Sequence, residues 1–226
     1  MQKSFPKITI VLATYQSNFI WLRELLESLR KQTYPNYEVL ICDDFSDPEI
    51  YKGISQIAEK ELCWVSYQIC QNQINMGSNK TFERLTDMAE GDYIAYCDQD
   101  DIWEKEKLEI LYREAIKKDA VMVYSDMSII DEKGRVCYRS LKQLRRRIRY
   151  RAGADLTAYY LFSNCSAGCS MMIKSSVAKR AIPFLKEFVC DQWLAVYAAA
   201  SGTIGFVKKT LVRYRQHNRN QSGVLK

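Results

Sequence analysis

Short apolar runs alternate with longer amphipathic stretches along the first 125 residues of the chain. The apolar runs predict strands at 8–13, 37–42, 65–70, 92–97 and 121–125. Apolar residues at helical spacing predict helices between them, at 19–31, 49–62, 78–89 and 105–117. This alternation favours an α/β fold with a Rossmann-like, mostly parallel sheet and helices on both of its faces. Ligands bind such sheets at the carboxyl ends of the strands, so we expect the functional residues there.

The rest of the chain is less regular. We expect helices at 155–163, 175–188 and 191–201, a strand at 168–174, and two late strands in the segments IGFV and TLVRYR. A chain of 226 residues without a Gly/Ser-rich linker is long enough to bury a core of its own. We therefore expect a single domain over 1–226.

Composition excludes several classes of protein. The chain has 33 Lys and Arg against 27 Asp and Glu, a net charge of +6, and no apolar window long enough for a membrane span or a signal peptide. Its eight cysteines form no CxxC pair and it has one histidine, which argues against a zinc cluster. We expect reduced, buried thiols in a cytoplasmic protein.

Carboxylates gather directly after the fourth predicted strand. Asp98, Asp100 and Asp101 lie within four residues, and like charges so close repel one another and raise the pKa of each group. Mg²⁺ or Mn²⁺ removes that conflict and also binds phosphates. The alternative is an acidic turn that caps the following helix. Asp43 and Asp44 follow the second predicted strand, a weaker signal because Asp also favours turns and N-caps.

Four segments resemble the motifs of the family 2 glycosyltransferases, in the order in which that family carries them. They are ITIVLATY, SLRKQTYPNYEVLICDDFSD, INMGSNKTF and EGDYIAYCDQDDIW. The resemblance extends over nearly the whole chain and implies the GT-A nucleotide-diphospho-sugar transferase fold. The form DQDDIW, with DQW and YRQH later in the chain, is most similar to the rhamnosyltransferase-type branch of bacterial envelope-glycan enzymes.

The resemblance implies that the first half of the chain, 1–101, binds the nucleotide. Ala13, Thr14 and Tyr15 fall where the family holds the nucleobase. Asp44 falls where a carboxylate reads the pyrimidine, and Asp43 is the neighbouring candidate for that role.

Asp98 and Asp100 are the DxD pair that the resemblance implies. Asp100 is expected to bind Mn²⁺ or Mg²⁺ directly, and Asp98 to contact the metal and the ribose or donor sugar. Gln99 and Lys80 also fall near the donor, but Lys80 is equally consistent with a solvated helix lysine. His217, in the pattern YRQHNRN, is implied as a metal or diphosphate contact; the alternative is a surface or core histidine.

Asp191 is the catalytic base that the resemblance implies for the second half of the chain, 102–226, which would bind the acceptor. Cys190 replaces the usual acidic neighbour, a departure that leaves the base in place and bears only on a supporting hydrogen bond. The structural alternative is that Asp191 caps the helix 191–201, since Asp favours N-caps.

Three weaker candidates complete the implied site. Trp103 is a candidate sugar contact or, equally, a core tryptophan. Arg215 and Arg219 are candidate contacts of the leaving diphosphate, in a C-terminal stretch that would close as a lid over the bound donor.

A basic run, LKQLRRRIRYR, occupies 141–151. Leu141, Leu144 and Ile148 recur at helical spacing, which predicts an amphipathic basic helix. Such a helix suits peripheral contact with an anionic membrane, at about 1 kcal/mol per basic residue, or a lipid-diphosphate acceptor. A solvated helix face is the third interpretation. Nucleic-acid binding is not expected, because no recognition motif accompanies the run.

The implied activity is metal-dependent, inverting transfer of rhamnose or another hexose from a dTDP- or UDP-sugar to a glycan or lipid-linked glycan acceptor. Two other classes compete with it. A sugar nucleotidyltransferase needs a Gly-rich loop after the first strand, where residues 14–18 contain no glycine. A non-catalytic module that binds nucleotide sugars or lipid surfaces does not need Asp100 and Asp191.

Overall fold

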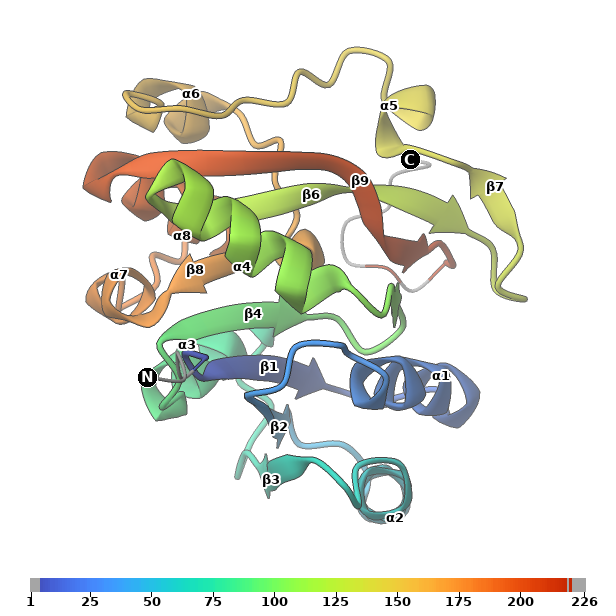
Figure 1. Ribbon diagram of the computed structural model, residues 1–226. Helices are drawn as coiled ribbons and strands as arrows, with labels where there is room; N and C mark the ends of the chain where they lie inside the picture. Colours follow the sequence, from blue (N-terminus) through green and yellow to red (C-terminus); the bar gives the residue numbers. More distant parts are fainter. Residues whose placement is uncertain (1–4, 219, 221–226) are drawn as a thin grey trace.

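A computed structural model describes residues 5–218 and 220. The strands in this part of the chain form one sheet in the order β3-β2-β1-β4-β8-β6-β9-β5, with β7 paired to β6 (Figure 1). The strands are β1 (Ile8–Thr14), β2 (Tyr37–Asp43), β3 (Ser66–Gln71), β4 (Tyr93–Cys97), β5 (Ile102–Trp103), β6 (Ala120–Ile130), β7 (Val136–Tyr138), β8 (Met171–Lys174) and β9 (Thr203–Arg215). The helices are α1 (Phe19–Arg30), α2 (Pro48–Glu61), α3 (Ser78–Met88), α4 (Lys107–Lys118), α5 (Leu141–Leu144), α6 (Thr157–Phe162), α7 (Ser175–Arg180) and α8 (Cys190–Ser201), with a 3₁₀ turn at Gly168–Ser170.

Most strands of the described sheet run in the same direction, and β5, β7 and β8 run opposite to them. The strand β1 pairs in parallel with β2 and β4, and β2 with β3. Since β8 is antiparallel to both β4 and β6, β6 runs in the same direction as β4, and β9 is parallel to β6. The carboxyl ends of β1, β2, β4 and β6 therefore lie along one edge of the sheet, beside the amino end of β8. The predicted mostly parallel α/β sheet is confirmed.

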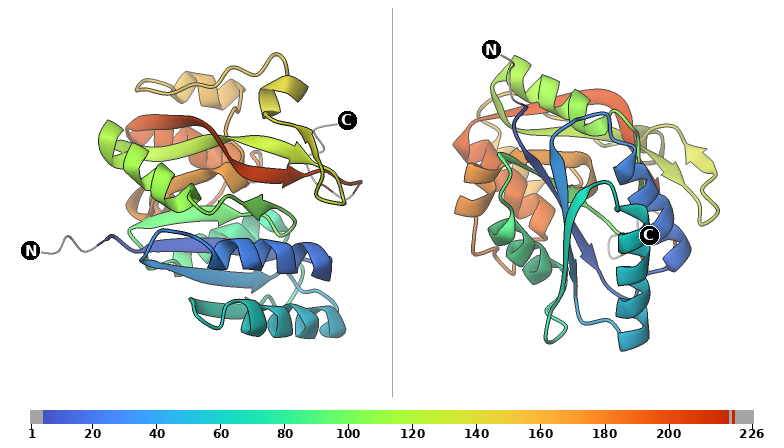
Figure 2. Two further views of the ribbon diagram at one scale, coloured as in Figure 1. Left: turned by 45° about the vertical axis from the view of Figure 1, so that its right-hand side comes forward. Right: turned by 60° about the horizontal axis from the view of Figure 1, so that its bottom comes forward.

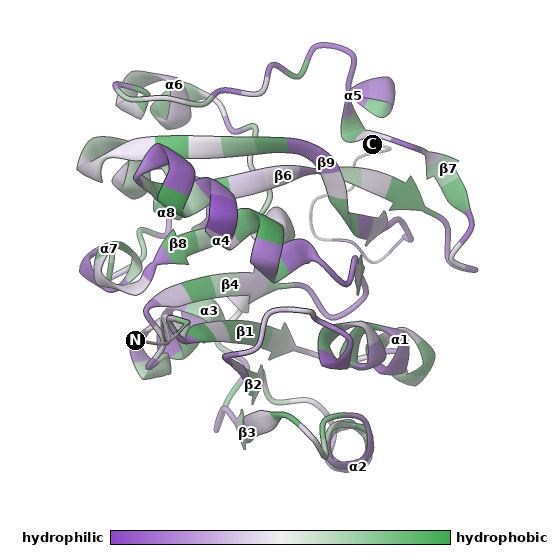
Figure 3. Cartoon of the chain, viewed as in Figure 1, coloured by the Kyte–Doolittle hydropathy of each residue, from purple (hydrophilic) through white to green (hydrophobic). Residues whose placement is uncertain are grey.

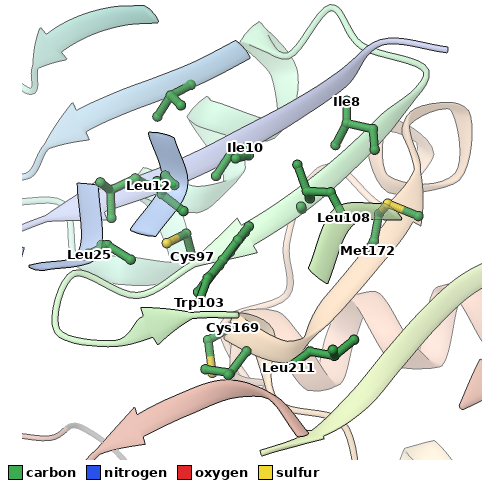
Figure 4. Close-up of a cluster of buried hydrophobic side chains, with 14 of the residues drawn as sticks. Ile8, Ile10, Leu12, Leu25, Cys97, Trp103, Leu108, Cys169, Met172 and Leu211 are labelled. Carbon is green, nitrogen blue, oxygen red and sulfur yellow. The ribbon is translucent and has the colours of Figure 1, made fainter. Parts of the chain in front are cut away.

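Helices cover both faces of the sheet and bury a separate core on each. Ile10 and Leu12 of β1 pack on one face with α1, α2 and α4, whereas Val11 packs on the other face with α3, α7 and α8. This division follows from the two-residue period of a strand. The close-up in Figure 4 shows the first core, where Trp103 and Leu108 lie beside β1. Figure 2 shows α1 and α2 on the opposite side of the sheet from α3.

Amphipathic helices supply the covering layers. In α4, Leu108, Leu111 and Ala115 are buried at a spacing of three to four residues, which places them on one side of the helix. Figure 3 shows hydrophilic residues along the exposed side of the same helix. Asp119 ends α4 in the left-handed conformation, at φ 44°. The first half of the chain thus follows its sequence pattern closely.

The second half departs from the predicted elements in three places. Residues 203–215 form one long strand instead of two, because β6 is itself longer than predicted and pairs with β9 past an irregularity at Ser125 and Asp126. The helix predicted at 175–188 ends at Arg180, since Pro183 cannot supply a helical N–H. The 3₁₀ turn replaces the start of the strand predicted at 168–174.

The amphipathic basic helix predicted at 141–151 is wrong. Only Leu141–Leu144 is helical, as α5. Beyond it, Tyr150 Oη donates to Asp126 Oδ1 at 2.5 Å, and Arg151 N donates to Tyr124 Oη at 2.9 Å. These tertiary hydrogen bonds hold the chain in a non-helical path, because a helix that continued from α5 would not place Tyr150 and Arg151 at these partners.

The structure also tests the expected burial of the cysteines. Cys42 and Cys97 are buried, as expected, but Cys63 and Cys137 are exposed, so the expectation of buried thiols is wrong for these two. Within the described part of the chain, none of the helices has the length and apolarity that crossing a membrane requires.

Candidate active site

A cleft of about 1060 Å³ lies along the edge of the sheet where β1, β2 and β4 end. Most of the predicted site residues line it, and they come from both halves of the chain. Those that line it are Ala13, Thr14, Tyr15, Asp44, Asp98, Gln99, Asp100, Asp191 and His217. Asp43, Lys80, Trp103 and Arg215 are not among its lining residues, and Arg219 lies outside the described residues.

Gln99 fixes the turn that follows β1. Its Oε1 accepts hydrogen bonds from Tyr15 N at 2.9 Å and from Ser17 Oγ at 2.5 Å, and its Nε2 donates to Tyr15 O at 3.0 Å. The side chain of Tyr15 stays 47% exposed beside the cleft. Gln99 therefore positions the predicted nucleobase-binding segment through its backbone.

The two aspartates after β2 have different surroundings. Asp43 is fully buried and accepts from Thr14 Oγ1 at 3.0 Å, from Ser46 N and Oγ at 2.7 Å each, and from Gln71 Nε2 at 3.0 Å. Both of its oxygens are thus used inside the protein. Asp44 is buried as well but lines the cleft, so Asp44 and not Asp43 is in position to meet a ligand.

Asp44 also organises the loop between β3 and α3. Its Oδ1 accepts from Met76 N and Asn72 Nδ2, and its Oδ2 accepts from Gly77 N, each at 2.8 Å. Gly77 has φ 81°, a conformation that a residue with a Cβ adopts only at a cost. The loop from the INMGSNKTF motif is therefore bonded directly to the end of β2.

The carboxylates after β4 are not fully hydrogen-bonded by donors of the protein. Asp101 Oδ1 accepts from Arg215 N at 3.0 Å, but buried Asp101 Oδ2 has no hydrogen-bond partner in the described part of the chain. Burial, followed by the charges of Asp100 and Asp191, raises the pKa of Asp98 to about 7. A site with this excess of negative charge is suited to a cation.

The C-terminal stretch packs against this acidic loop. His217 Nε2 lies 2.6 Å from Asp100 Oδ2, and its ring stacks on Trp21 with 4.7 Å between ring centroids. Asn220 Nδ2 donates to the same carboxylate at 3.4 Å. The expected lid segment thus lies beside the acidic loop in the structure.

Arg215 holds that stretch in place from beneath. It is fully buried, its Nε donates to Asp100 O at 2.8 Å, and its guanidinium pairs with Glu24 at 2.5 Å. Since Glu24 balances its charge and it does not line the cleft, Arg215 is a support of the acidic loop in this structure. Trp21 and Glu24 were missed by sequence reasoning, because a tryptophan and a glutamate inside a helix pattern carry no local signal.

The donor set of this corner fits a hard divalent cation. Asp98 and Asp100 offer carboxylate oxygens and His217 offers an imidazole nitrogen, ligand types that Mn²⁺ accepts. Among the described residues, however, the three ligand atoms that lie within 4.8 Å of one another are those of Asp98, Asp101 and Cys169. Burial raises the pKa of the Cys169 thiol well above its usual value, and a hard cation prefers oxygen ligands to sulfur.

Asp191 lies in the first turn of α8, facing the cleft. The helix begins at Cys190 and its N-cap is Val189, so the alternative interpretation, in which Asp191 is the N-cap, is wrong. Its Oδ2 accepts from Gly168 N at 3.3 Å, while its buried Oδ1 has no partner in the described part of the chain. Burial raises the pKa of Asp191 to about 6. A carboxylate with a free oxygen and this pKa is suited to accept a proton near neutral pH.

Asn79 is the cleft residue that sequence reasoning overlooked in favour of its neighbour. Its Oδ1 accepts from Cys190 N at 2.9 Å and its Nδ2 donates to Phe188 O at 2.7 Å. It therefore ties the start of α3 to the start of α8 and positions Asp191. Lys80 instead points to solvent and pairs with Glu83 at 2.8 Å. Asn79 belongs to the motif INMGSNKTF and directly precedes Lys80, the residue that was predicted to lie near the donor.

Trp103 is a core residue, the alternative that the sequence left open. It is 3% exposed and packs in the core between α1 and α4 (Figure 4). The buried Lys107 ammonium lies over its ring, 3.0 Å from the centroid. Burial lowers the pKa of Lys107 to about 7. The tryptophan ring is therefore covered and does not reach the cleft.

Comparison with known families identifies the class of protein to which this fold and cleft belong. The sequence model of glycosyl transferase family 2 matches residues 9–180. The chain belongs to this family, so it is a sugar-transferring enzyme with the GT-A fold, and the family resemblance of its motifs is confirmed.

Individual relatives are identical to this chain at about a quarter of the matched positions. The *Escherichia coli* protein WfgD, a UDP-Glc:α-D-GlcNAc-diphosphoundecaprenol β-1,3-glucosyltransferase, is 23% identical over 191 residues, which are 84% of this chain and 69% of WfgD. The dTDP-rhamnosyl transferase RfbG of *Shigella flexneri* is 26% identical over 94% of this chain and 73% of its own length. The names of these two relatives specify different donors, UDP-Glc and dTDP-rhamnose.

Solved structures share the fold at low identity. Residues 1–349 of *S. aureus* TarS in complex with UDP-GlcNAc match with a TM-score of 0.72 and 20% identity, over 95% of this chain and 60% of that one. The mannosyltransferase PcManGT of *Pyrobaculum calidifontis*, in complex with GDP-Man and Mn²⁺, matches with a TM-score of 0.74 and 15% identity, over 96% and 59%. The chain thus spans less than two thirds of either solved chain.

Proposed function

We propose that the protein is a metal-dependent, inverting glycosyltransferase that moves rhamnose or another hexose from a nucleoside-diphosphate sugar to a glycan hydroxyl, in the synthesis of a bacterial surface polysaccharide. The observation that carries this proposal is the cleft itself. It is lined by Asp98, Asp100, His217 and Asp191, and Asp191 Oδ1 has no partner in the described part of the chain.

The donor occupies the β1–β2 side of the cleft in this proposal. Ala13, Thr14 and Tyr15 bind the nucleobase, with Asp44 as the acceptor for a pyrimidine N3–H. A UDP- or dTDP-sugar is supported by the relatives, whose names specify UDP-Glc and dTDP-rhamnose donors. Residues 1–101 would form the nucleotide half of a single domain, and 102–226 the acceptor half.

A divalent cation, Mn²⁺ or Mg²⁺, would be held by Asp98, Asp100 and His217. When bound it stabilises negative charge on the leaving diphosphate. The protein's own part is to keep these ligands in place: Arg215 fixes the backbone of the acidic loop, and Trp21 orients the His217 ring. The GDP-Man and Mn²⁺ complex of PcManGT supports the metal by analogy of fold alone.

Asp191 is the general base of the proposed reaction. It takes the proton from the acceptor hydroxyl as that oxygen attacks the anomeric carbon, and proton transfer of this kind contributes about 10²–10⁴ in rate. Attack opposite the leaving diphosphate inverts the anomeric configuration. Gly168 and Asn79 hold the carboxylate and its helix in position.

The test is Asp191→Asn, which preserves size but removes the proton acceptor. We expect transfer to fall by about 10²–10⁴ while affinity for UDP with Mn²⁺ stays within twofold. Asp119→Asn is the matched control, because that side chain is 97% exposed at the end of α4 and does not line the cleft. Near-parental transfer by Asp191→Asn, or a product that retains the donor's configuration, contradicts the assignment. Nucleotide binding without donor turnover in the parent supports a binding module instead.

A further inference from the structure

A second hollow of about 630 Å³ opens beside the cleft, between the basic run and α6. Arg145, Ile148 and Asn164 line both hollows, so the two are continuous. We call the second one the arginine groove. It is lined by Leu144, Arg145, Arg146, Arg147, Ile148, Arg149, Tyr159, Ser163 and Asn164. In Figure 1 this part of the chain runs from α5 to α6, along the β6–β9 side of the sheet.

The arginines of the groove are not neutralised by the protein. Arg145, Arg146, Arg147 and Arg149 are all exposed, and none of them forms an ion pair with a carboxylate among the described residues. Four adjacent positive charges repel one another. An anion with more than one charge removes that repulsion, and guanidinium groups bind phosphate oxygens in a two-pronged geometry.

The groove is held at both ends by one buried carboxylate. Asp126 accepts from Ser140 Oγ at 2.5 Å just before the basic run, and from Tyr150 Oη at 2.5 Å near its end. It also accepts from Leu141 N at 3.2 Å. Asp126 is 6% exposed, so this clasp lies inside the protein. These hydrogen bonds explain why the arginine-bearing loop follows this path and does not form the predicted helix.

The wall opposite the loop adds a second support. Tyr159 Oη donates to Arg149 O at 3.2 Å, and its ring lies 5.5 Å from the Arg151 guanidinium carbon. The groove therefore has one wall from the basic loop and one from α6, both bonded to each other.

The position of Arg145 connects the groove to the catalytic base. Burial is the largest influence on the pKa of Asp191 and raises it, whereas the charge of Arg145 lowers it. Arg145 and Asp191 line the same cleft, and Arg145 also lines the arginine groove. The groove is therefore open to the part of the cleft that Asp191 lines.

We propose that the arginine groove binds a diphosphate ester carried by the acceptor, while the acceptor's hydroxyl lies at Asp191. This inference rests on the proposed function, since it assigns the acceptor's chemical class at the same site. Four arginines favour a diphosphate over a single carboxylate, because a diphosphate carries more charge and more acceptor oxygens. The continuity of the two hollows favours a substrate over a membrane surface.

The test uses geranyl diphosphate as a soluble probe, titrated by calorimetry in EDTA. Without a metal, the carboxylates of Asp98, Asp100 and Asp101 repel a diphosphate from the donor side, so the groove is measured alone. We expect the triple variant of Arg146, Arg147 and Arg149 to Gln to bind at least tenfold more weakly than the parent. The matched control removes the same charge at exposed Lys52, Lys117 and Lys118, which lie on α2 and α4. It should bind within twofold of the parent.

Three outcomes overturn the proposal. They are equal affinity of the arginine variant and the parent, an equal loss in the lysine control, and binding of the parent to vesicles of phosphatidylglycerol and phosphatidylcholine without binding of geranyl diphosphate. The last outcome makes the groove a membrane contact. Geraniol and geranyl monophosphate separate the contributions of the chain and of each phosphate.

A separate measurement keeps the two proposals distinguishable. Binding of UDP with Mn²⁺, and hydrolysis of UDP- or dTDP-sugars, report on the donor side without the groove. If these are present and geranyl diphosphate does not bind, the acceptor class is wrong and the glycosyltransferase proposal stands. If both are absent, the proposed function fails first.

Discussion

The two walls of the cleft differ in how far their polar groups are satisfied. On the β1–β2 wall, Asp43 and Asp44 both have every carboxylate oxygen hydrogen-bonded within the protein. Gln99 is bonded to Tyr15 through both of its side-chain polar atoms. This wall is rigid and complete before any ligand arrives, which lowers the entropic cost of binding.

The opposite wall is incomplete. Asp191 Oδ1 is buried without a partner in the described part of the chain, as is Asp101 Oδ2 in the acidic loop, and the exposed arginines of the adjoining groove pair with no carboxylate there. Unpaired buried polar atoms cost stability. They are retained where a substrate, a proton or a cation supplies the missing partner, so the difference separates a preformed donor wall from a catalytic wall that a ligand completes.

The largest expected effect on this comparison comes from Asp100→Asn. It removes a negative charge from the acidic corner and weakens the proposed metal site. Because a metal ion contributes several kcal/mol to charge stabilisation, we expect turnover to fall on the order of 10³-fold. Calorimetry with UDP should then show no gain from Mn²⁺. If UDP binds the variant with undiminished Mn²⁺ dependence, Asp100 is not a ligand and the acidic corner belongs with the preformed wall. Asp119→Asn is again the matched control.

The pH dependence of transfer gives the next effect. The pKa of Asp191 is raised by burial to about 6, and only the ionised carboxylate accepts a proton. Transfer at saturating donor, acceptor and Mn²⁺ should therefore be level above pH 7 and fall below pH 6, about tenfold between pH 8 and pH 5. UDP affinity measured at each pH controls for protonation of Asp98. A flat pH profile of transfer across pH 5–8 would show that Asp191 is not the general base.

Local sequence signals predicted the preformed wall well. The runs that become β1, β2 and β4 are apolar on both faces because helices cover both, and their polar ends follow directly. Asp44, Asp98 and Asp100 could therefore be placed from pattern and motif together. The elements on this side are joined by short, sequence-local connections, so periodicity decides them.

The catalytic wall depends on contacts that no local pattern encodes. Asp126 fixes residues 140–150 across the sheet, which overrides the helical spacing of Leu141, Leu144 and Ile148. Likewise Glu24, 191 residues away from Arg215 in sequence, turns that arginine from an expected diphosphate contact into a buried support. Such pairings between distant segments are where tertiary structure overrides propensity.

The smallest effect is a difference in stability between the same substitution on the two walls. Asp43→Asn places an amide N–H₂ against the hydroxyl, backbone and amide donors that Asp43 now accepts from. An unsatisfied buried group costs about 1–3 kcal/mol, or roughly 5 °C in Tm for a chain of this size. Asp191→Asn should not lose stability at pH 8, although both changes replace one carboxylate in the same cleft region.

The direction of the stability change in Asp191→Asn follows from the raised pKa of Asp191. Its carboxyl holds a proton more tightly in the folded protein, at about 6, than at its usual 3.8, so its contribution to stability falls as pH rises from 3.8 to 6 and stays low above. At pH 8 the parent carries an ionised, partly buried carboxylate, and the neutral amide removes that cost. The Tm of Asp191→Asn should therefore equal or exceed that of the parent at pH 8, and this advantage should be smaller at pH 5. Thermal scans of both variants at the two pH values check it. A loss of stability by Asp191→Asn comparable with that of Asp43→Asn would show that Asp191 is structural, and the two walls would then not differ.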